Sequence, residues 1–531
     1  MDNNSAAPTP QPWPMHHHGA PILQTDLTPN QKLYWDAYNT TTYFTLQTPH
    51  AFSLRLHLIT LILSGIFLYP IVMVLNNVKS KRFLPALYIQ SIISLISCIT
   101  YANFINNVPV LYPNMAYSKM VLGLAIFTLL NMAFQSIHFL KNYYLSPNSA
   151  YNPLKSIDDE MELELETPSS PSTLYENDHD SISDFNLFQQ STSTSFSFKW
   201  SNRLSTLSPL ITFFHNASLW GLFFYFTILF PTMLADLSLF GMHNRIFNLL
   251  AHWIKGGIFF LIGVLSLARY CGCFEQIGGA WNQTSISYNQ DPISNSLFIK
   301  FHRFIPNNGL ILSFEFMESL LIFIYGSTNV FLEHLASPGG AWTAKDLQHV
   351  SIAFMYLGAG ICGLLVEFKL SSWKKSLYSA KTDSSSSSSS SSSPDLVTPG
   401  FSPNPFPIFT IFWTGLLMSK HAQASQLSTE IHVQWGSLLT YGTFFRLLTF
   451  ILMSYPPFRS NKPTKPLTEL ITSFCLLSGG LIFMESTDQV IEALAYRGLT
   501  PMFTMNVSVG IVALIMAWIM CVFAIKDRLK A

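Results

Sequence analysis

Long apolar runs alternate with polar segments along most of this chain. Each run holds roughly 17–25 residues, the length that a helix needs to cross the hydrocarbon core of a bilayer. Backbone groups in lipid must find partners within their own segment, so every run is expected to be an α-helix. The pattern predicts an all-α, polytopic membrane protein with about eleven transmembrane helices, at 53–76, 84–106, 119–140, 209–234, 246–268, 309–332, 348–369, 404–420, 432–454, 467–484 and 503–525.

Two polar, low-complexity segments interrupt this series of apolar runs. Residues 145–208 carry an acidic run followed by Ser, Thr and Pro, and residues 371–403 contain ten consecutive serines. Both lack the apolar residues that folding requires, so we expect disordered cytosolic linkers. The resulting regions are a disordered non-cytosolic tail (1–52), a three-helix membrane domain (53–144), the acidic linker (145–208), a four-helix membrane unit (209–370), the poly-Ser linker (371–403) and a second four-helix unit (404–531).

The two predicted four-helix units share short sequence matches. Residues 327–336 read STNVFLEHLA, residues 486–495 read STDQVIEALA, and each segment closes an apolar run. In addition, His252 opens one span in the sequence HWIKG, and His432 opens the corresponding span in HVQWG. These matches predict an internal duplication, and membrane proteins built from repeats often bind their ligands at the repeat interface.

Composition supports the membrane assignment and the distribution of basic residues gives an orientation. Charged residues make up 11% of the 531 residues, and the mean hydropathy is +0.30. This excludes an ordinary soluble protein, and no nucleic-acid-binding motif is present. Lys and Arg concentrate in alternate loops, which predicts a non-cytosolic N-terminus and a cytosolic C-terminus. The bilayer, either the plasma membrane or an endomembrane, is the expected partner.

Histidines gather at the predicted outer ends of the helices. The candidate shared site contains His252, His334, His349, His421 and His432. The acidic residues Glu333 and Asp346 lie on the same side. Imidazoles with nearby carboxylates form the usual ligand shells of zinc, copper and haem iron. The alternative is that each histidine only caps a helix at the membrane interface.

Several ionisable residues lie inside the predicted spans, where they are costly and often mark function. Glu315 and Glu318 lie one turn apart on one span, while Arg446 and Lys255 lie on two others. One interpretation is a proton or ion path. The other is a set of internal ion pairs, such as Lys255 with Glu333.

Five short motifs resemble fungal Ytp-like membrane proteins. They lie at 318–334, 346–349, 418–421, 431–435 and 280–282. The resemblance extends over about residues 50–140 and 205–527. It implies a fungal, multi-pass membrane protein and specifies no activity.

The three N-terminal spans are also similar to ascorbate-reducible b-type cytochromes. His57 near the start of a span, followed by Tyr69-Pro70, carries this similarity. It implies haems held by paired histidines near both membrane faces. The chain departs from that pattern, because the second span has no histidine and the third begins with Tyr117-Ser118.

These observations give three hypotheses, and none assigns a catalytic residue. The first is haem-dependent trans-membrane electron transfer with haem b and a redox partner, whose expected cofactor ligands are His57, His252, His349 and His432. The second is binding or transport of a metal ion, copper or zinc, whose further expected ligands are His334, His421, Glu333 and Asp346. The third is a non-catalytic membrane scaffold.

Overall fold

The described part of the computed structural model is almost entirely helical. It comprises residues 19–145, 194–273, 281, 284–285, 313–332, 340–342, 344–385, 397–398, 402–421, 423–453 and 465–530. Within these residues the only strands are the two-residue β1 (Thr284–Ser285) and β2 (Val397–Thr398), which pair antiparallel. The predicted all-α, polytopic membrane architecture is confirmed.

Most predicted spans correspond to single helices. In the described part of the chain, nine are long and apolar enough to cross a membrane: Ala51–Asn77, Phe83–Ile105, Ala116–Lys141, Ser208–Leu237, Arg245–Tyr270, Leu347–Leu370, Gln426–Met453, Leu467–Glu485 and Pro501–Lys530. The two remaining predicted spans fall on α9 (Phe314–Leu332) and on the shorter apolar helix α11 (Phe406–Ser419).

The chain forms two compact units. The small unit comprises Thr48–Val110 and Met115–Thr232, and the large unit comprises Met1–Gln47, Leu111–Asn114 and Met233–Ala531. Most of α6 (Thr194–Leu237) therefore packs with the first three spans. The sequence-based division had grouped the whole fourth span with the helices that follow it.

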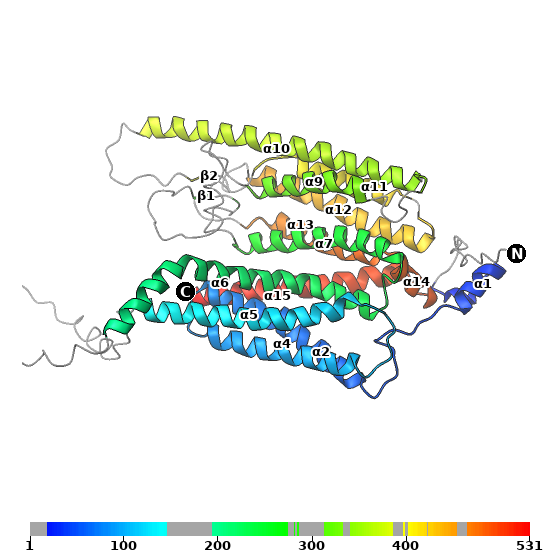
Figure 1. Ribbon diagram of the computed structural model, residues 1–531. Coiled ribbons are helices and arrows are strands. Elements are labelled where there is room, and N and C mark those ends of the chain that lie inside the picture. Colours follow the sequence, from blue (N-terminus) through cyan, green and yellow to red (C-terminus); the bar gives the residue numbers. More distant parts are fainter. Residues whose placement is uncertain are drawn as a thin grey trace, which may run out of the picture. The chain divides into compact units, whose positions relative to one another are not determined.

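The other helices of the small unit are drawn in blue to cyan in Figure 1. They are α2 (Ala51–Ile62), α3 (Tyr69–Asn77), α4 (Phe83–Ile105) and α5 (Ala116–Leu145). A π-helical segment, η2 (Leu63–Leu68), joins α2 to α3 within one continuous span. Pro70 lies just beyond η2 and has no N–H to donate, so the regular α-helical bonding pattern is interrupted there.

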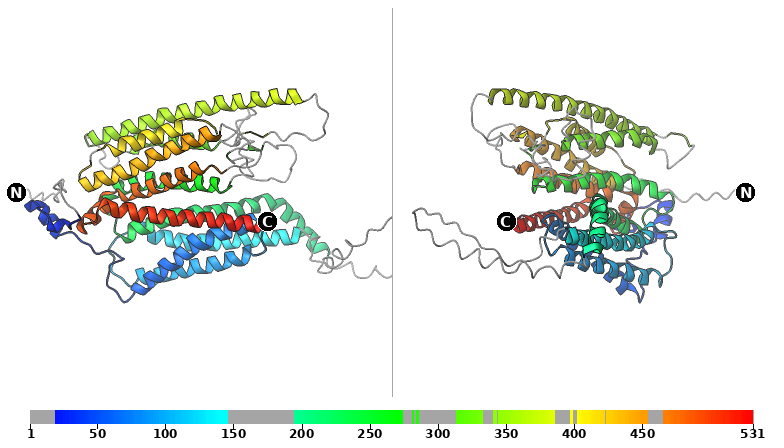
Figure 2. Two further views of the ribbon diagram at one scale, coloured as in Figure 1. Left: turned by 180° about the vertical axis from the view of Figure 1, so that it is seen from behind. Right: turned by 60° about the vertical axis from the view of Figure 1, so that its left-hand side comes forward.

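The large unit contains the remaining helices. In chain order they are α1 (Pro29–Asp36), α7 (Arg245–Tyr270), α9, α10 (Ala344–Ser385), α11, α12 (Gln426–Met453), α13 (Leu467–Glu485), α14 (Asp488–Tyr496) and α15 (Pro501–Lys530). Figures 1 and 2 show α13 between α7 and α12, and α9 beside α10. These neighbours bring residues that are far apart in the sequence into one interior.

Glycines allow these helices to approach closely. A Cβ added at Gly256 on α7 would lie 2.6 Å from the Gly480 carbonyl oxygen on α13. A Cβ at Gly436 on α12 would lie 2.6 Å from the Gly415 carbonyl oxygen on α11. Small residues at such crossings let membrane helices pack backbone to backbone. Gly256 and Gly436 each follow a matched histidine by four residues, so both matched segments place a glycine at a close helix crossing, although the partner helices, α13 and α11, do not correspond.

Segments expected to be disordered contribute helices to the structure. Residues 19–52 include η1 (Ile22–Gln24) and α1, which a Thr28–Gln31 capping box begins. Trp35 on α1 is only 2% exposed and packs in the core of the large unit. Burial of this aromatic ring compensates for ordering the segment. In the predicted linkers, α6 begins at Thr194 and α10 extends to Ser385.

Candidate functional site

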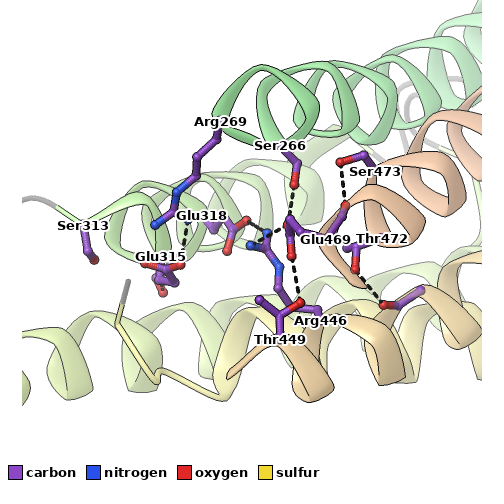
Figure 3. A network of polar contacts seen from close by, with 12 residues as sticks. Ser266, Arg269, Ser313, Glu315, Glu318, Arg446, Thr449, Glu469, Thr472 and Ser473 are labelled. Carbon is purple, nitrogen blue, oxygen red and sulfur yellow. Dashed lines mark hydrogen bonds and ion pairs between the residues drawn. The ribbon is translucent and has the colours of Figure 1, made fainter. Parts of the chain in front are cut away.

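Six charged side chains meet between the helices of the large unit. We call them the charged network: Arg269, Glu315, Glu318, Glu367, Arg446 and Glu469. Every member is at most 8% exposed. Figure 3 shows the part of the network that α7, α9, α12 and α13 contribute. Burying several charges in a membrane protein is unfavourable unless they are paired, so this cluster is the first candidate site.

Arg446 on α12 joins two carboxylates from different helices. Its Nη2 donates to Glu318 Oε1 on α9 at 2.8 Å, and its Nη1 lies 2.9 Å from Glu469 Oε1 on α13. In Figure 3 the guanidinium lies between the two acids. One cation therefore connects α9, α12 and α13.

Glu469 lies in the first turn of α13, where the helix dipole stabilises a negative charge. The Ser266 hydroxyl on α7 and the Thr449 hydroxyl on α12 also donate to this carboxylate. Because its side chain is fully buried, these donors replace the water it would otherwise bind. Glu469 thus connects α13 to both neighbouring helices.

Arg269 on α7 forms the second ion pair of the network. Its Nη1 donates to Glu315 Oε1 at 3.1 Å, and both side chains are 1% exposed. The guanidinium carbon lies 3.8 Å from the ring centroid of Trp281, a cation–π contact. The backbone N–H of Ser402 donates to the other Glu315 oxygen at 3.0 Å. Glu315 is therefore held by side-chain and main-chain donors.

Glu367 on α10 is held by neutral donors. The Ser313 hydroxyl donates to its Oε2 at 2.8 Å, and Asn404 Nδ2 donates to its Oε1 at 2.9 Å. Asn404 Nδ2 also lies 3.3 Å from the Ser319 hydroxyl oxygen on α9. Glu367 thus adds a fourth buried carboxyl group to a site with two described guanidinium groups.

A small pocket adjoins the charged network. Its volume is about 20 Å³, and Glu318, Arg446, Thr443, Thr472 and Cys475 are among the residues that line it. A site needs roughly 10–15 Å³ to hold one water molecule. In this conformation the pocket accommodates a water molecule or a small ion.

Two of the predicted cofactor ligands lie together elsewhere in the large unit. The ring centroids of His252 and His432 are 6.0 Å apart. Each ring donates one hydrogen bond within its own helix, from His252 Nδ1 to the Asn248 carbonyl oxygen and from His432 Nδ1 to the Ser428 carbonyl oxygen. This bond fixes the orientation of each ring. The two histidines open the matched sequences HWIKG and HVQWG.

His57 belongs to the small unit, and hydrogen bonds engage both of its ring nitrogens. Nδ1 lies 2.8 Å from the Ser97 carbonyl oxygen, and Nε2 lies 2.6 Å from the Tyr117 hydroxyl. The imidazole is fully buried. Binding a metal or haem iron would require His57 to give up one of these bonds.

The other predicted ligands are not brought into one described site. His349 lies in the first turns of α10 and His421 just beyond α11, and each is half-buried. The backbone of Asp346 lies in α10, while Glu333 and His334 fall outside the described residues. Over the described residues, no group of three His, Cys, Asp or Glu side chains is placed to hold a metal ion. The predicted ion pair of Lys255 with Glu333 also involves a residue outside the described part of the chain. Lys255 Nζ lies 5.9 Å from the Tyr325 ring centroid.

A smaller polar cluster links α1, α7 and α14, outside the membrane-spanning core. Glu492 Oε1 accepts from Arg245 Nη2 at 2.6 Å and from the Tyr34 hydroxyl at 3.2 Å. Burial, followed by the negative charge of Glu492, raises the pKa of Tyr34 to about 12. These bonds attach the N-terminal helix to the rest of the unit.

Sequence reasoning singled out three members of the charged network and missed the others. Glu315, Glu318 and Arg446 were conspicuous because they interrupt apolar runs. Arg269 and Glu469 lie near the ends of their helices, where charged residues are common, and gave no such signal. Arg269 and Glu469 differ from the usual charged residues at the ends of membrane helices because each has a buried partner on another helix.

Two family models match the chain. The model described as "Protein YTP1-like, C-terminal" matches residues 225–527, and one described as a domain of unknown function, DUF2427, matches residues 37–140. The chain belongs to the YTP1-like family. The predicted family resemblance is therefore confirmed, and the C-terminal match includes every member of the charged network.

Relatives agree with a multi-pass membrane protein. The chain is 44% identical to the uncharacterized membrane protein YCR061W of Saccharomyces cerevisiae, over 99% of this chain and 90% of that protein. It is 39% identical to the uncharacterized membrane protein C3B8.06 of Schizosaccharomyces pombe, over 51% of this chain and 50% of that protein. No solved structure matches. Together with the apolar helices, these relatives support a multi-pass membrane protein, whereas the cytochrome similarity stays a prediction.

Proposed function

We propose that this protein is a proton-coupled transporter of a small cation and that the charged network is its proton- and ion-binding site. The observation that carries this proposal is the excess of acid over base. Four buried carboxyl groups face two guanidinium groups among the described residues. With every group ionised, these residues would hold two uncompensated negative charges. Binding protons or a cation removes that unfavourable charge.

The geometry of the network supports a functional role beyond simple ion pairing. A structural pair needs one acid for each base, whereas Arg446 alone contacts both Glu318 and Glu469. Protonation of either acid would leave Arg446 paired with the other. Because the two acids lie on different helices, the protonation state can change which helices are held together. The adjoining pocket of about 20 Å³ favours a proton, water or small ion over a larger solute.

The test is proton flux into liposomes that contain the purified protein. A membrane potential imposed with potassium and valinomycin would drive protons towards a trapped pH-sensitive dye. We expect the Glu318→Gln variant, which keeps an oxygen for Arg446 but cannot titrate, to reduce flux at least about tenfold, a difference of about 1.4 kcal/mol in the barrier. Glu430→Gln is the matched control, since Glu430 lies on α12 with an exposed side chain.

Flux equal to that of protein-free liposomes for the wild type, over a range of monovalent and divalent cations, would refute the proposal. So would full flux in a folded Glu318→Gln variant. The unfolding temperature of each variant separates loss of flux from loss of fold.

Haem-dependent electron transfer is the second candidate, with the pair of His252 and His432 as its support. The two imidazoles come from different helices and lie close enough to ligate one metal ion between them. The nearby Phe483 ring, 5.6 Å from His252 between centroids, would have to move to admit a porphyrin. A reduced-minus-oxidised absorption spectrum decides this candidate, because bound haem b gives Soret and α bands that His432→Ala should abolish. Copper or zinc at the same pair would instead appear in metal analysis.

A further inference from the structure

The small unit has a polar interior of a different kind. α4 carries Gln90, Ser94, Ser97 and Tyr101 at helical spacing, and all four side chains are at most 2% exposed. α5 carries Thr128, Asn131 and Gln135 in the same manner, each at most 1% exposed. α6 adds His215 and Ser218, which are 6% and 5% exposed. We call this set the polar stripe.

Antiparallel packing places the stripe residues of α4 and α5 at common levels. The Tyr101 hydroxyl lies 2.8 Å from Ser118 Oγ, and the Tyr88 hydroxyl lies 2.6 Å from Ser136 Oγ. Between these two contacts the helices run in opposite directions, and the interval from Tyr101 to Tyr88 on α4 lies beside the interval from Ser118 to Ser136 on α5. Ser94 therefore lies near the level of Thr128. By the same argument, Gln90 lies between the levels of Asn131 and Gln135.

Hydrogen bonds continue the stripe at both ends. At one end, His57 contacts the Tyr117 hydroxyl through Nε2 and Ser97 through Nδ1. At the other, Gln135 Nε2 donates to the His215 carbonyl and to Ser218 Oγ. Tyr117 and Gln135 are 18 residues apart on α5, roughly 27 Å along the helix. This length is close to the thickness of a bilayer's hydrocarbon core, about 30 Å.

Six polar atoms of the stripe have no hydrogen-bond partner among the described residues. They are Gln90 Nε2, Ser94 Oγ, Thr128 Oγ1, Asn131 Nδ2, Gln135 Oε1 and His215 Nδ1. Leaving one buried polar group unsatisfied costs about 1–3 kcal/mol. Other hydroxyls in the unit avoid this cost by bonding to their own helix, as Thr60 and Thr100 do. In the described chain Ser94 and Thr128 form no such bond, so their hydroxyls can bond to a bound molecule.

We propose that the polar stripe binds a chain of ordered water molecules, which connects His57 with the His138–His215 pair and forms a route for protons. Water fits this site because the unsatisfied atoms include both donors and acceptors, distributed along the stripe. A bound ion would require a local charge, and the six atoms belong to amides, hydroxyls and one imidazole. His138 and His215 stack with centroids 3.9 Å apart, so an imidazole ends the stripe on each side. This route lies in the small unit and does not depend on the charged network.

Radiolytic labelling in ¹⁸O-water tests the hydration directly, because bound water generates hydroxyl radicals next to the side chains that it touches. In the full-length protein we expect label on Tyr117 and His215 in spite of their burial. Tyr69 is the internal control. It is equally buried in the same unit but lies outside the polar stripe, and its hydroxyl donates to the Leu219 carbonyl at 2.7 Å. Label absent from both Tyr117 and His215 would overturn the proposal.

Proton flux tests the route itself. Measured in liposomes with Glu318→Gln as the parent, flux should fall at least about threefold when Thr128→Val and Asn131→Leu are added. Thr60→Val added to the same parent is the control, since the Thr60 hydroxyl bonds within its helix. A folded double variant with the same flux as the Glu318→Gln parent would overturn the proton route. The route would also be overturned if the stripe residues are labelled but the Glu318→Gln parent conducts no protons.

Discussion

The interiors of the two units hold buried polar side chains by different kinds of interaction. Both lie among helices that are long enough to span a bilayer, and both hold polar side chains away from solvent. The large unit buries full charges and pairs them, as Arg269 pairs with Glu315. The small unit buries amides, hydroxyls and histidines, and leaves six of their atoms without a partner in the described chain.

This difference teaches how each interior can respond to protons. A charged network gains or loses whole charges, so a change in protonation alters which helices attract one another. The neutral stripe holds no ion pair, so a proton that passes along it does not change which helices are paired. Under the proposed function, the large unit changes conformation when its carboxyl groups gain or lose protons, whereas the small unit stays rigid.

The largest effect is expected from breaking the charged interior. Arg446→Leu removes the cation that Glu318 and Glu469 share, and leaves two buried acids without it. Removing one partner of a buried pair costs about 3–5 kcal/mol. We expect a marked loss of stability, measured by thermal or denaturant unfolding in detergent.

Arg497→Leu provides the control for that loss. Arg497 is exposed and its guanidinium donates to the Ala493 carbonyl on α14, so its removal should change stability by less than about 0.5 kcal/mol. Similar unfolding curves for the two variants would mean that the buried ion pairs contribute nothing, and the comparison between the units would fail.

A smaller effect is expected in the neutral interior. Tyr117→Phe removes the hydroxyl that lies 2.6 Å from His57 Nε2 and leaves that nitrogen with one partner fewer in a buried site. The expected cost is about 1–3 kcal/mol. Tyr225→Phe is a milder change in the same unit, because the half-buried Tyr225 hydroxyl donates to a backbone carbonyl of α5. A loss as large as that of Arg446→Leu would show that the small unit depends on its polar contacts as strongly as the large unit does.

The sequence predicted the membrane helices well because crossing a bilayer requires long apolar segments whatever the tertiary structure. It also singled out Glu315, Glu318 and Arg446, since charges inside apolar runs are conspicuous. It could not predict the network that they form. Arg446 meets Glu469 only because α12 crosses α13, and the positions of the crossings depend on glycines whose partners lie on other helices.

Two other expectations from the sequence differ from the structure. The N-terminal tail was expected to be disordered from its composition, yet Trp35 and Ile22 anchor part of it in the core of the large unit. A few buried apolar contacts are sufficient to order this segment, and the composition of the whole tail does not reveal them. The histidines were expected to gather in one site. Of these, the structure brings His252 and His432 together.

The smallest predicted effect lies outside both interiors, where α1 meets α14. Tyr34 has an ordinary pKa of 10.0, which burial and the charge of Glu492 raise to about 12 in the folded protein. The unfolded chain therefore loses this proton first as pH rises. Its contribution to stability is complete below pH 10 and is lost between pH 10 and 12.

Tyr34→Phe should reduce the fall of the unfolding temperature between pH 10 and 12, and the part of that fall caused by other groups should remain. Tyr38 provides an internal reference, since burial raises its pKa too and a Tyr38→Phe variant keeps the Tyr34 contribution. An unchanged pH profile in Tyr34→Phe would mean that α1 is not held against α14 in the membrane-embedded protein.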